Sequence, residues 1–236
     1  MSELTANAPR TRSSAMSVRK LVCLAMLCAV AYVVMFLSKT IFAPLTVNGF
    51  LTFDLKDVVI AIGGFLYGPV SAFAISAVVS LIEMFTVSET GPVGLLMNVL
   101  STIAFVCPAA FLYRRRHKFS SAVAGLMVGG VLMTVIMLLW NYLITPLYQH
   151  IPRDVVAAML PTVFLPFNVV KAIMNGALTV VLYKPVVTAL RKARLVPEHQ
   201  GSASAAGKKS MAGVSIVAVI VLATALLLAL VLAGKI

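Results

Sequence analysis

Long apolar segments recur along this chain, and they constrain its fold more than any other feature. A helix needs about 20 predominantly apolar residues to cross the hydrocarbon core of a bilayer, and several segments approach or exceed that length. Of the 236 residues, 61% are hydrophobic and only 11% are charged, which excludes an ordinary soluble domain. Backbone polar groups in a bilayer must be satisfied within the protein, and apolar segments of this kind do so as helices. The sequence therefore predicts an all-α integral membrane protein.

The predicted spans follow from the apolar runs and from the breaks between them. The run 58–87 is interrupted by Gly63, Gly64 and the pair Gly68-Pro69, so it is either one kinked helix or a hairpin of two shorter helices. If the basic residues at 19–20 and 114–118 lie on the same side of the membrane, an even number of spans must separate them, which favours the hairpin. The predicted spans are Leu21–Leu37, two helices within Val58–Val87, Val93–Tyr113, Ser121–Leu147, Pro161–Arg194 and Met211–Gly234.

Basic residues lie in short clusters between these runs. The formal net charge of +12 is of the kind that nucleic-acid-binding proteins carry, but the chain has no basic platform interleaved with aromatic residues, so we expect no nucleic acid as a partner. The clusters at 19–20, 114–118 and 191–194 instead match the positive-inside rule. We expect a multi-pass protein of the cell membrane, with a cytoplasmic amino terminus and an extracellular carboxyl terminus.

Composition divides the chain into four parts. Residues 1–18 are polar and basic, which is typical of a disordered cytoplasmic tail. Residues 19–194 carry six predicted spans, residues 195–210 form a linker rich in Gly, Ser and Ala, and residues 211–236 contain one more apolar segment. Because this last segment has almost no polar residue, we expect it to be an additional transmembrane helix that faces lipid.

A row of polar side chains marks the span that begins at Pro161. At helical spacing Asn168, Lys171 and Asn175 point the same way. A charged side chain in the hydrocarbon region costs at least about 2.5 to 3.5 kcal/mol, so Lys171 needs a partner. The partner is either another group of the protein or a ligand. In a variant of the first alternative, the lysine snorkels and its ammonium reaches the membrane surface. We favour a ligand site.

Other polar residues are expected at the same depth in the membrane. Asn141, Asn98 and Thr52 join the row on the Pro161 span. Carboxamides donate and accept hydrogen bonds, whereas lysine only donates, so together they suit a ring edge on which carbonyls flank an N–H. The nearby aromatic residues are able to sandwich a flat ring, and they are Phe50, Phe53, Trp140, Tyr142, Phe164 and Phe167. The combination predicts a planar heteroaromatic vitamin as the ligand.

Three acidic residues and one glycine are interpreted from local sequence. Asp54 and Asp57 precede an apolar run, and we interpret both as capping carboxylates at a helix start. Glu83 falls late in its span, near enough to the outer surface to be wet, and receives no role. Gly94 allows close backbone approach to a ligand or a neighbour, although a plain turn explains it equally well.

The chain resembles the substrate-binding S component of an energy-coupling-factor (ECF) vitamin transporter, in the riboflavin-specific branch. The resemblance runs from about residue 19 to 194. It rests on Phe53-Asp54-Leu55-x-Asp57, Ile62-Gly63-Gly64-Phe65-x-Tyr67-Gly68-Pro69, Gly91-x-x-Gly94-x-x-x-Asn98, Trp140-Asn141-Tyr142 and Asn168-x-x-Lys171. The resemblance implies a six-helix S-component bundle, to which this chain adds one C-terminal transmembrane helix.

The resemblance also implies a binding mode and partners. Asn141, Asn168 and Lys171 would hydrogen-bond the pyrimidine-like edge of riboflavin, and Leu51 and Thr52 would contact it from the loop 38–56 above. Asn98 and Gly94 complete the substrate-binding residues that we expect. Riboflavin is the transported ligand, and no cofactor is expected.

The expected partners are a transmembrane T component and two cytoplasmic ATPases. Ala25 and Ala29 match the alanine motif with which the first helix of this family docks on the T component. A face of small residues of this kind lets another helix approach closely.

Other classes of function fit the sequence less well. The ligand could be another vitamin, such as thiamin or biotin. A stand-alone secondary transporter would need inverted repeats and a titratable coupling site near the midplane, and no repeat is visible. An intramembrane enzyme would need a nucleophile with a base or a metal cluster. His117, His150 and His199 all fall in loops or tails, so no such site assembles, and we expect no enzyme.

Overall fold

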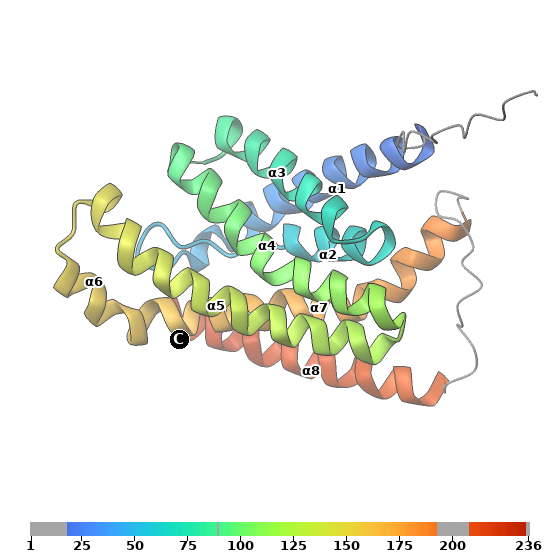
Figure 1. Ribbon diagram of the computed structural model, residues 1–236. Helices are drawn as coiled ribbons and strands as arrows, with labels where there is room; N and C mark the ends of the chain where they lie inside the picture. Colours follow the sequence, from blue (N-terminus) through green and yellow to red (C-terminus); the bar gives the residue numbers. More distant parts are fainter. Residues whose placement is uncertain (1–17, 89, 193–207, 235–236) are drawn as a thin grey trace, which may run out of the picture.

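The computed structural model describes residues 18–88, 90–192 and 208–234, and these residues form an all-helical structure (Figure 1). The tail expected at residues 1–17 and most of the linker expected at 195–210 lie outside the described residues. Five helical stretches are long and apolar enough to cross a membrane, and they are Val18–Leu45, Pro69–Thr86, Gly91–Arg116, Phe119–Gln149 and Arg153–Leu190. The prediction of an all-α multi-pass membrane protein is confirmed.

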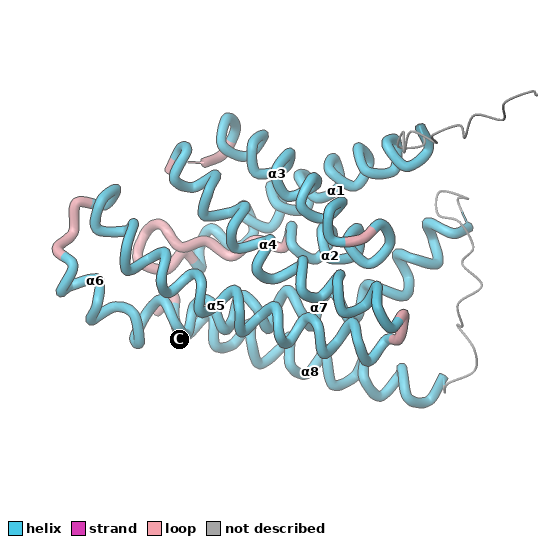
Figure 2. Tube along the Cα trace, viewed as in Figure 1, coloured by secondary structure: helices cyan, strands magenta, loops and turns pink. Residues whose placement is uncertain are grey.

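The amino-terminal helix and the loop that follows it lead into the interior. Helix α1 (Val18–Phe42) continues into a 3-10 turn, η1 (Ala43–Leu45). Residues 46–55 form the loop, which Figure 2 draws among the helix ends. Within this loop Val47 and Leu51 exchange two backbone hydrogen bonds of 2.9 and 3.0 Å. The loop connects η1 to the next helix from inside the bundle, since Phe53 and Asp54 are buried.

The predicted break in the run 58–87 is confirmed at Gly68. Helix α2 (Lys56–Tyr67) ends there and α3 (Pro69–Thr86) begins, with Gly68 at φ +91°, a conformation that favours glycine. The hairpin reading is only partly right, however. The 12 residues of α2 extend about 18 Å, less than the roughly 30 Å of a hydrocarbon core. Helix α2 is therefore an interior helix too short to cross a membrane by itself.

Helices α4 (Gly91–Arg116) and α5 (Phe119–Gln149) pack with their backbones in contact. A Cβ atom at Gly125 would lie 2.7 Å from the Cα atom of Ala109, and one at Gly129 would overlap the carbonyl oxygen of Phe105. Small residues allow such close approach between membrane helices.

The segment 148–159, between the predicted spans Ser121–Leu147 and Pro161–Arg194, is mostly helical. Helix α6 (Arg153–Met159) runs through a wide π-helical turn, η2 (Leu160–Phe164), into α7 (Leu165–Lys192). Pro161 lies in this turn, where its missing N–H and its ring do not fit a regular α-helix. The connection after α5 is thus short, and α7 carries the polar row.

Helix α8 (Lys208–Leu232) lies alongside α7. One face of α8 buries Ala218, Ala225 and Ala229, while Ile216, Ile220 and other large apolar side chains are exposed. The expectation of a lipid-facing helix therefore holds only for the exposed face.

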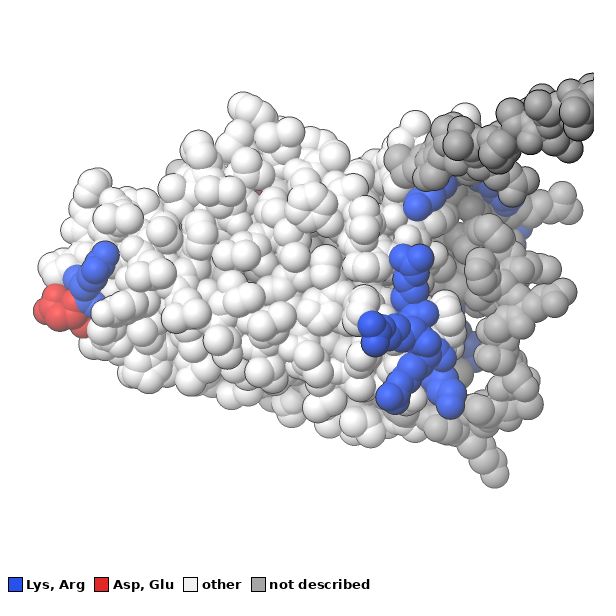
Figure 3. Space-filling view, in the orientation of Figure 1, with Lys and Arg blue, Asp and Glu red and all other residues white. Residues whose placement is uncertain are grey.

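Charged side chains on the face seen in Figure 3 gather at the two ends of the molecule. Lys and Arg cluster where α4 meets α5, and this end includes Arg114, Arg115 and Arg116. The belt between the two ends is nearly free of charge on this face, as expected for a surface in contact with lipid.

Candidate binding site

A cavity of about 360 Å³ lies beneath the loop 46–55. Its walls come from the end of α1, η1, the loop itself, the turn between α3 and α4, and the nearby parts of α4, α5 and α7. The volume falls in the range of small-molecule pockets, roughly 300 to 1,000 Å³. The cavity therefore has the size of a site for a small organic ligand.

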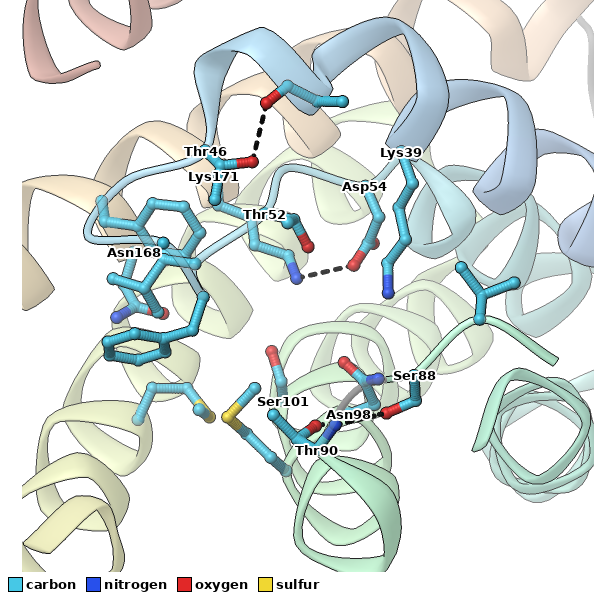
Figure 4. A pocket seen from close by; sticks show the side chains of 18 of the residues that line it. Lys39, Thr46, Thr52, Asp54, Ser88, Thr90, Asn98, Ser101, Asn168 and Lys171 are labelled. Atoms are coloured by element: carbon cyan, nitrogen blue, oxygen red, sulfur yellow. Dashed lines mark hydrogen bonds and ion pairs between the residues drawn. The ribbon is translucent and has the colours of Figure 1, made fainter. Parts of the chain in front are cut away.

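The polar row on α7 forms one wall of this cavity. Asn168 and Lys171 line it, whereas Asn175 lies one turn deeper and is buried. Lys171 Nζ lies 3.0 Å from Asp54 Oδ2 and donates a hydrogen bond to it (Figure 4). Asn175 Nδ2 donates to the backbone oxygen of Asp54 at 3.1 Å. The loop and α7 are thus tied together at Asp54, which gives Lys171 a structural partner; a ligand contact of Lys171 stays a prediction.

Buried ion pairs extend from this contact through the protein. Lys56 Nζ lies 3.9 Å from Asp54 Oδ2 and 2.5 Å from Glu83 Oε2. Glu83 in turn accepts a hydrogen bond of 2.6 Å from Lys39, which also lines the cavity. Asp54, Lys56 and Glu83 are all at most 2% exposed. A buried charge is costly unless it is paired, and this chain of alternating charges satisfies that requirement.

The interpretation of Asp54 and Asp57 as helix caps is wrong. The residue at the N-cap of α2 is Leu55, and no side chain donates or accepts a capping hydrogen bond there. Asp57 instead accepts a 2.6 Å hydrogen bond from Thr102 on α4. The expectation that Glu83 is wet is also wrong, since Glu83 is 0% exposed and pairs with two lysines.

Asp54 lies in the loop, outside the membrane-spanning helices, and neighbouring ammonium groups stabilise its negative charge. Burial alone would raise the pKa of this carboxyl, but the ammonium groups of Lys171 and Lys56 hold the pKa far below its usual range. Asp54 therefore remains a carboxylate at neutral pH, and Lys171 has an ionised partner.

Most of the predicted binding residues are brought together. Leu51, Thr52, Asn98, Asn141, Asn168 and Lys171 all line the cavity. Gly94 does not line it. A Cβ atom at Gly94 would overlap the hydroxyl of Thr90, so the close approach at this glycine is to a neighbouring side chain.

Two of the three carboxamides that line the cavity, Asn141 and Asn168, have their Nδ2 groups engaged within their own helices. Asn141 Nδ2 donates to the carbonyl oxygen of Met137 at 2.7 Å, and its Oδ1 accepts from Thr145 at 3.0 Å. Asn168 Nδ2 donates to the carbonyl oxygen of Phe164 at 2.8 Å. These bonds orient both groups, and each Nδ2 keeps a second hydrogen to offer to a ligand.

The aromatic side chains are less concentrated than the sequence suggested. Phe50 and Phe167 line the cavity. Phe53 lies behind Phe167, with ring centroids 4.6 Å apart, and Phe164 lies 6.2 Å from Phe50. Trp140 packs against the hydrophobic core and does not line the cavity. The expected sandwich is thus reduced to Phe50 and Phe167.

Several polar residues that line the cavity were not predicted from the sequence. Ser88, Thr90 and Ser101 lie on the wall opposite Lys171, as Figure 4 shows, and Lys39 points in from α1. The only sequence signal for Lys39 was a charge just after an apolar run, which is equally typical of a membrane boundary. The opposite wall adds hydroxyl groups that both donate and accept hydrogen bonds.

The charged groups around the cavity are all paired, with Asp54 and Glu83 shared among three lysines. Lys39 and Lys171 are paired with Glu83 and Asp54, so the polar wall presents hydrogen-bonding groups without an unpaired charge among the described residues. No group of His, Cys, Asp and Glu able to hold a metal ion occurs within the described ranges. The site is suited to an uncharged ligand with a planar part and several polar atoms.

The two alanines of the predicted docking motif lie away from this cavity. Ala25 and Ala29 are exposed on α1, and they remain exposed with α8 in place. The neighbouring Cys23, Leu24 and Leu27 are buried instead. The exposed alanines leave a shallow strip on α1 that a second helix is able to approach.

Comparisons with known proteins agree with the fold. A sequence model of the family described as "ECF transporter, substrate-specific component" matches residues 19–187. The riboflavin transporter FmnP of Bacillus subtilis (strain 168) is 31% identical over 168 residues, covering 67% of this chain and 87% of that protein. The riboflavin transporter RibU of Staphylococcus aureus (strain TCH60) is 27% identical over 181 residues, covering 74% of this chain and 93% of that protein.

A solved structure shares the fold. It is described as "Structure and mechanism of the S component of a bacterial ECF transporter", and it superposes with a TM-score of 0.61 at 24% sequence identity. The match covers 73% of this chain and 98% of that chain. At this identity the likeness shows the fold alone.

Proposed function

Because this chain belongs to the family of ECF transporter substrate-specific components, whose members are transport proteins and not enzymes, we propose that it binds riboflavin and takes part in its uptake. The observation that carries the proposal is the wall made by Asn141, Asn168 and Lys171 beneath the loop 46–55. Two curated relatives named as riboflavin transporters support this choice of ligand. Riboflavin is the transported substrate in this proposal, and no cofactor takes part.

In the proposed complex the heteroaromatic ring lies against Phe50 and Phe167. Its pyrimidine-like edge faces the carboxamides of Asn141 and Asn168 and the ammonium of Lys171, while Leu51 and Thr52 cover it from the loop. The ribityl hydroxyls face Asn98 and the hydroxyl-rich opposite wall. A donor or acceptor that the ligand leaves unpaired in such a site costs about 1 to 3 kcal/mol, so the match of polar atoms decides which vitamin binds.

We propose that six membrane segments within residues 19–194 form the S-component body, with α2 as a short inner member and α8 as a seventh, additional helix. The basic end at Arg114–Arg116 faces the cytoplasm under the positive-inside rule. In this proposal the loop 46–55 and α2 together make one crossing, so four crossings separate the amino terminus from Arg114–Arg116. The amino terminus is then cytoplasmic as well, and the cavity and the carboxyl terminus face outward.

We further propose that uptake requires a transmembrane T component and two ATPases, as family membership implies. The exposed strip at Ala25 and Ala29 is the docking site for the T component in this proposal. Energy for uptake then comes from the separate ATPase subunits.

A flavin-binding measurement tests the proposal directly. Riboflavin is titrated into the detergent-purified protein while its fluorescence is followed, with thiamin and biotin in parallel. We expect tight quenching with riboflavin only. Asn168→Ala should weaken binding about tenfold or more, because it removes a polar partner from the wall. Val169→Ala, the exposed neighbour on the same helix, is the control and should bind normally. Tight binding of thiamin or biotin in place of riboflavin would reject riboflavin as the substrate.

A further inference from the structure

Helix α8 lies outside the part of the chain that the known relatives share. The family match ends at residue 187, and the solved S component is covered almost completely by 73% of this chain. Helix α8 nevertheless packs along α7 and also contacts η1, at the end of the molecule where the cavity lies. A helix beyond the matched body therefore reaches η1, whose Ala43 lines the cavity.

The contact uses one narrow face of α8. Ala218, Leu222, Ala225 and Ala229 share this face at helical spacing. Ala225 and Ala229 are only 2% and 0% exposed, whereas Leu228 and Val231 on the outer side are 51% and 56% exposed. Small side chains on the inner face allow α8 to approach α7 and η1 closely.

The inner face of α8 belongs to the same apolar cluster as the loop over the cavity. Ala225 and Ala229 share this cluster with Val47, Leu51 and Phe53 of the loop, and Leu45 of η1 packs against it. Leu51 also lines the cavity. One side of the loop thus faces the ligand space, while the cluster behind it includes α8.

The hydrogen bonds that tie the loop to the rest of the protein lie at its two ends. Thr46 N and Oγ1 donate to the carbonyl oxygen of Ala43 at 3.2 and 2.8 Å, Leu55 N donates to Ser38 Oγ at 3.1 Å, and the Val47–Leu51 pair lies within the loop. Its tip, at Asn48 and Gly49, is exposed. The position of the loop therefore depends on apolar packing behind it and on the Asp54 contacts at its far end.

We propose that α8 is a positioning element for substrate binding, which holds the loop 46–55 closed over the ligand. The inference rests on the proposed function, because it concerns the release of riboflavin from the same cavity. A larger side chain on the inner face of α8 pushes this helix away from η1 and the loop. Bound riboflavin then dissociates faster, although its polar contacts remain intact.

The test compares matched substitutions on the two faces of α8 in the full-length protein. Ala229→Leu adds bulk on the inner face, and Ala223→Leu makes the same change at an exposed position of α8. The dissociation rate of riboflavin is measured by the recovery of flavin fluorescence after dilution. We expect Ala229→Leu to raise this rate about tenfold, the scale of an overpacked contact, and Ala223→Leu to leave it unchanged.

A rescue experiment separates positioning from general loss of stability. Leu45→Ala removes bulk from η1 without altering a residue that lines the cavity. Combined with Ala229→Leu, it should return the dissociation rate towards the wild-type value, whereas two independent defects would add. If Ala229→Leu does not fold, Leu222→Ala weakens the same contact by removing packing and should also speed dissociation.

The outcomes separate this inference from the proposed function. Failure of the wild-type protein to bind riboflavin would reject the proposed function itself. The role of α8 alone would be overturned if the wild-type protein binds riboflavin normally and the dissociation rates of Ala229→Leu and Leu222→Ala stay within twofold of the rate of Ala223→Leu.

Discussion

Helices α7 and α8 lie side by side and are both apolar, but they are held in the protein by different means. The 28 residues of α7 bury Asn168, Lys171, Asn175 and Thr179. The 25 residues of α8 bury only alanines among those whose burial is described. Polar groups in α7 need specific partners, and Lys171 finds Asp54 at a separation of 117 residues in the chain. Helix α8 needs only a matching shape.

The difference shows how function and packing separate within a membrane. A buried polar group has few acceptable positions, so it fixes the helix that carries it in rotation and depth. A face of alanines permits close approach but specifies position less sharply. The ligand cavity lies on the polar side of this pair, and the added helix supports it from the apolar side.

The largest effect is expected from removing the charge on α7. Lys171→Met keeps most of the stem but leaves Asp54 with Lys56 at 3.9 Å as its remaining cationic partner. The unpaired carboxylate lowers stability, whereas the ligand loses a hydrogen bond from a charged donor, which is worth about 1.5 to 3 kcal/mol, so riboflavin affinity should fall about 100-fold. A fluorescence titration measures this effect.

The double variant Lys171→Met with Asp54→Asn is the control for this prediction. It removes the unpaired carboxylate, so thermal stability in detergent should recover while affinity stays low. Wild-type affinity in Lys171→Met would show that the polar face of α7 is structural and would break the contrast with α8.

An intermediate effect is expected deeper on the same helix. Asn175→Ala removes a hydrogen bond to the loop but also a buried Oδ1 atom that has no hydrogen-bonding partner in the structure. The free energy of unfolding should fall by about 1 kcal/mol, the net value of one hydrogen bond. Because Asn175 does not line the cavity, the riboflavin dissociation constant should change less than about threefold. A loss of affinity as large as that of Lys171→Met would mean that the ligand site extends a full turn deeper.

The smallest effect is expected on the outer face of α8. Leu228→Ala shortens a side chain that is 51% exposed and lies on the outer face of α8. Stability should change by no more than about 0.5 kcal/mol, as is usual for surface positions. Thermal unfolding in detergent measures it. A clear loss of stability would indicate that this face is covered by another protein or by a second copy of the chain.

The sequence predicted best those features that depend on single residues in an apolar setting. Lys171, Asn168 and Asn141 stand out because hydrocarbon tolerates polar groups poorly, and the structure places all three in the cavity wall. The break at Gly68 was equally visible, because glycine followed by proline rarely continues a helix.

The features that the sequence missed depend on contacts between distant segments. Asp54 and Asp57 had the local pattern of a helix start, but their partners Lys171 and Thr102 lie on helices far along the chain. The prediction that Glu83 is wet came from its distance along a span. That distance carries no information on Lys39 and Lys56, with which Glu83 pairs. The wide turn at Pro161 was missed because proline was taken as a helix start.

The backbone contact between α4 and α5 also sets how freely this protein can vary. A single methyl group at Gly129 would overlap the carbonyl oxygen of Phe105, and one at Gly125 would press on the Cα atom of Ala109. The opposing atoms belong to the main chain, so no compensating change of a side chain makes room for it. Proteins that diverge from this one are free to change the outer face of α8 or to exchange ligand contacts one at a time. Where α4 and α5 touch, glycine is the one acceptable residue at positions 125 and 129.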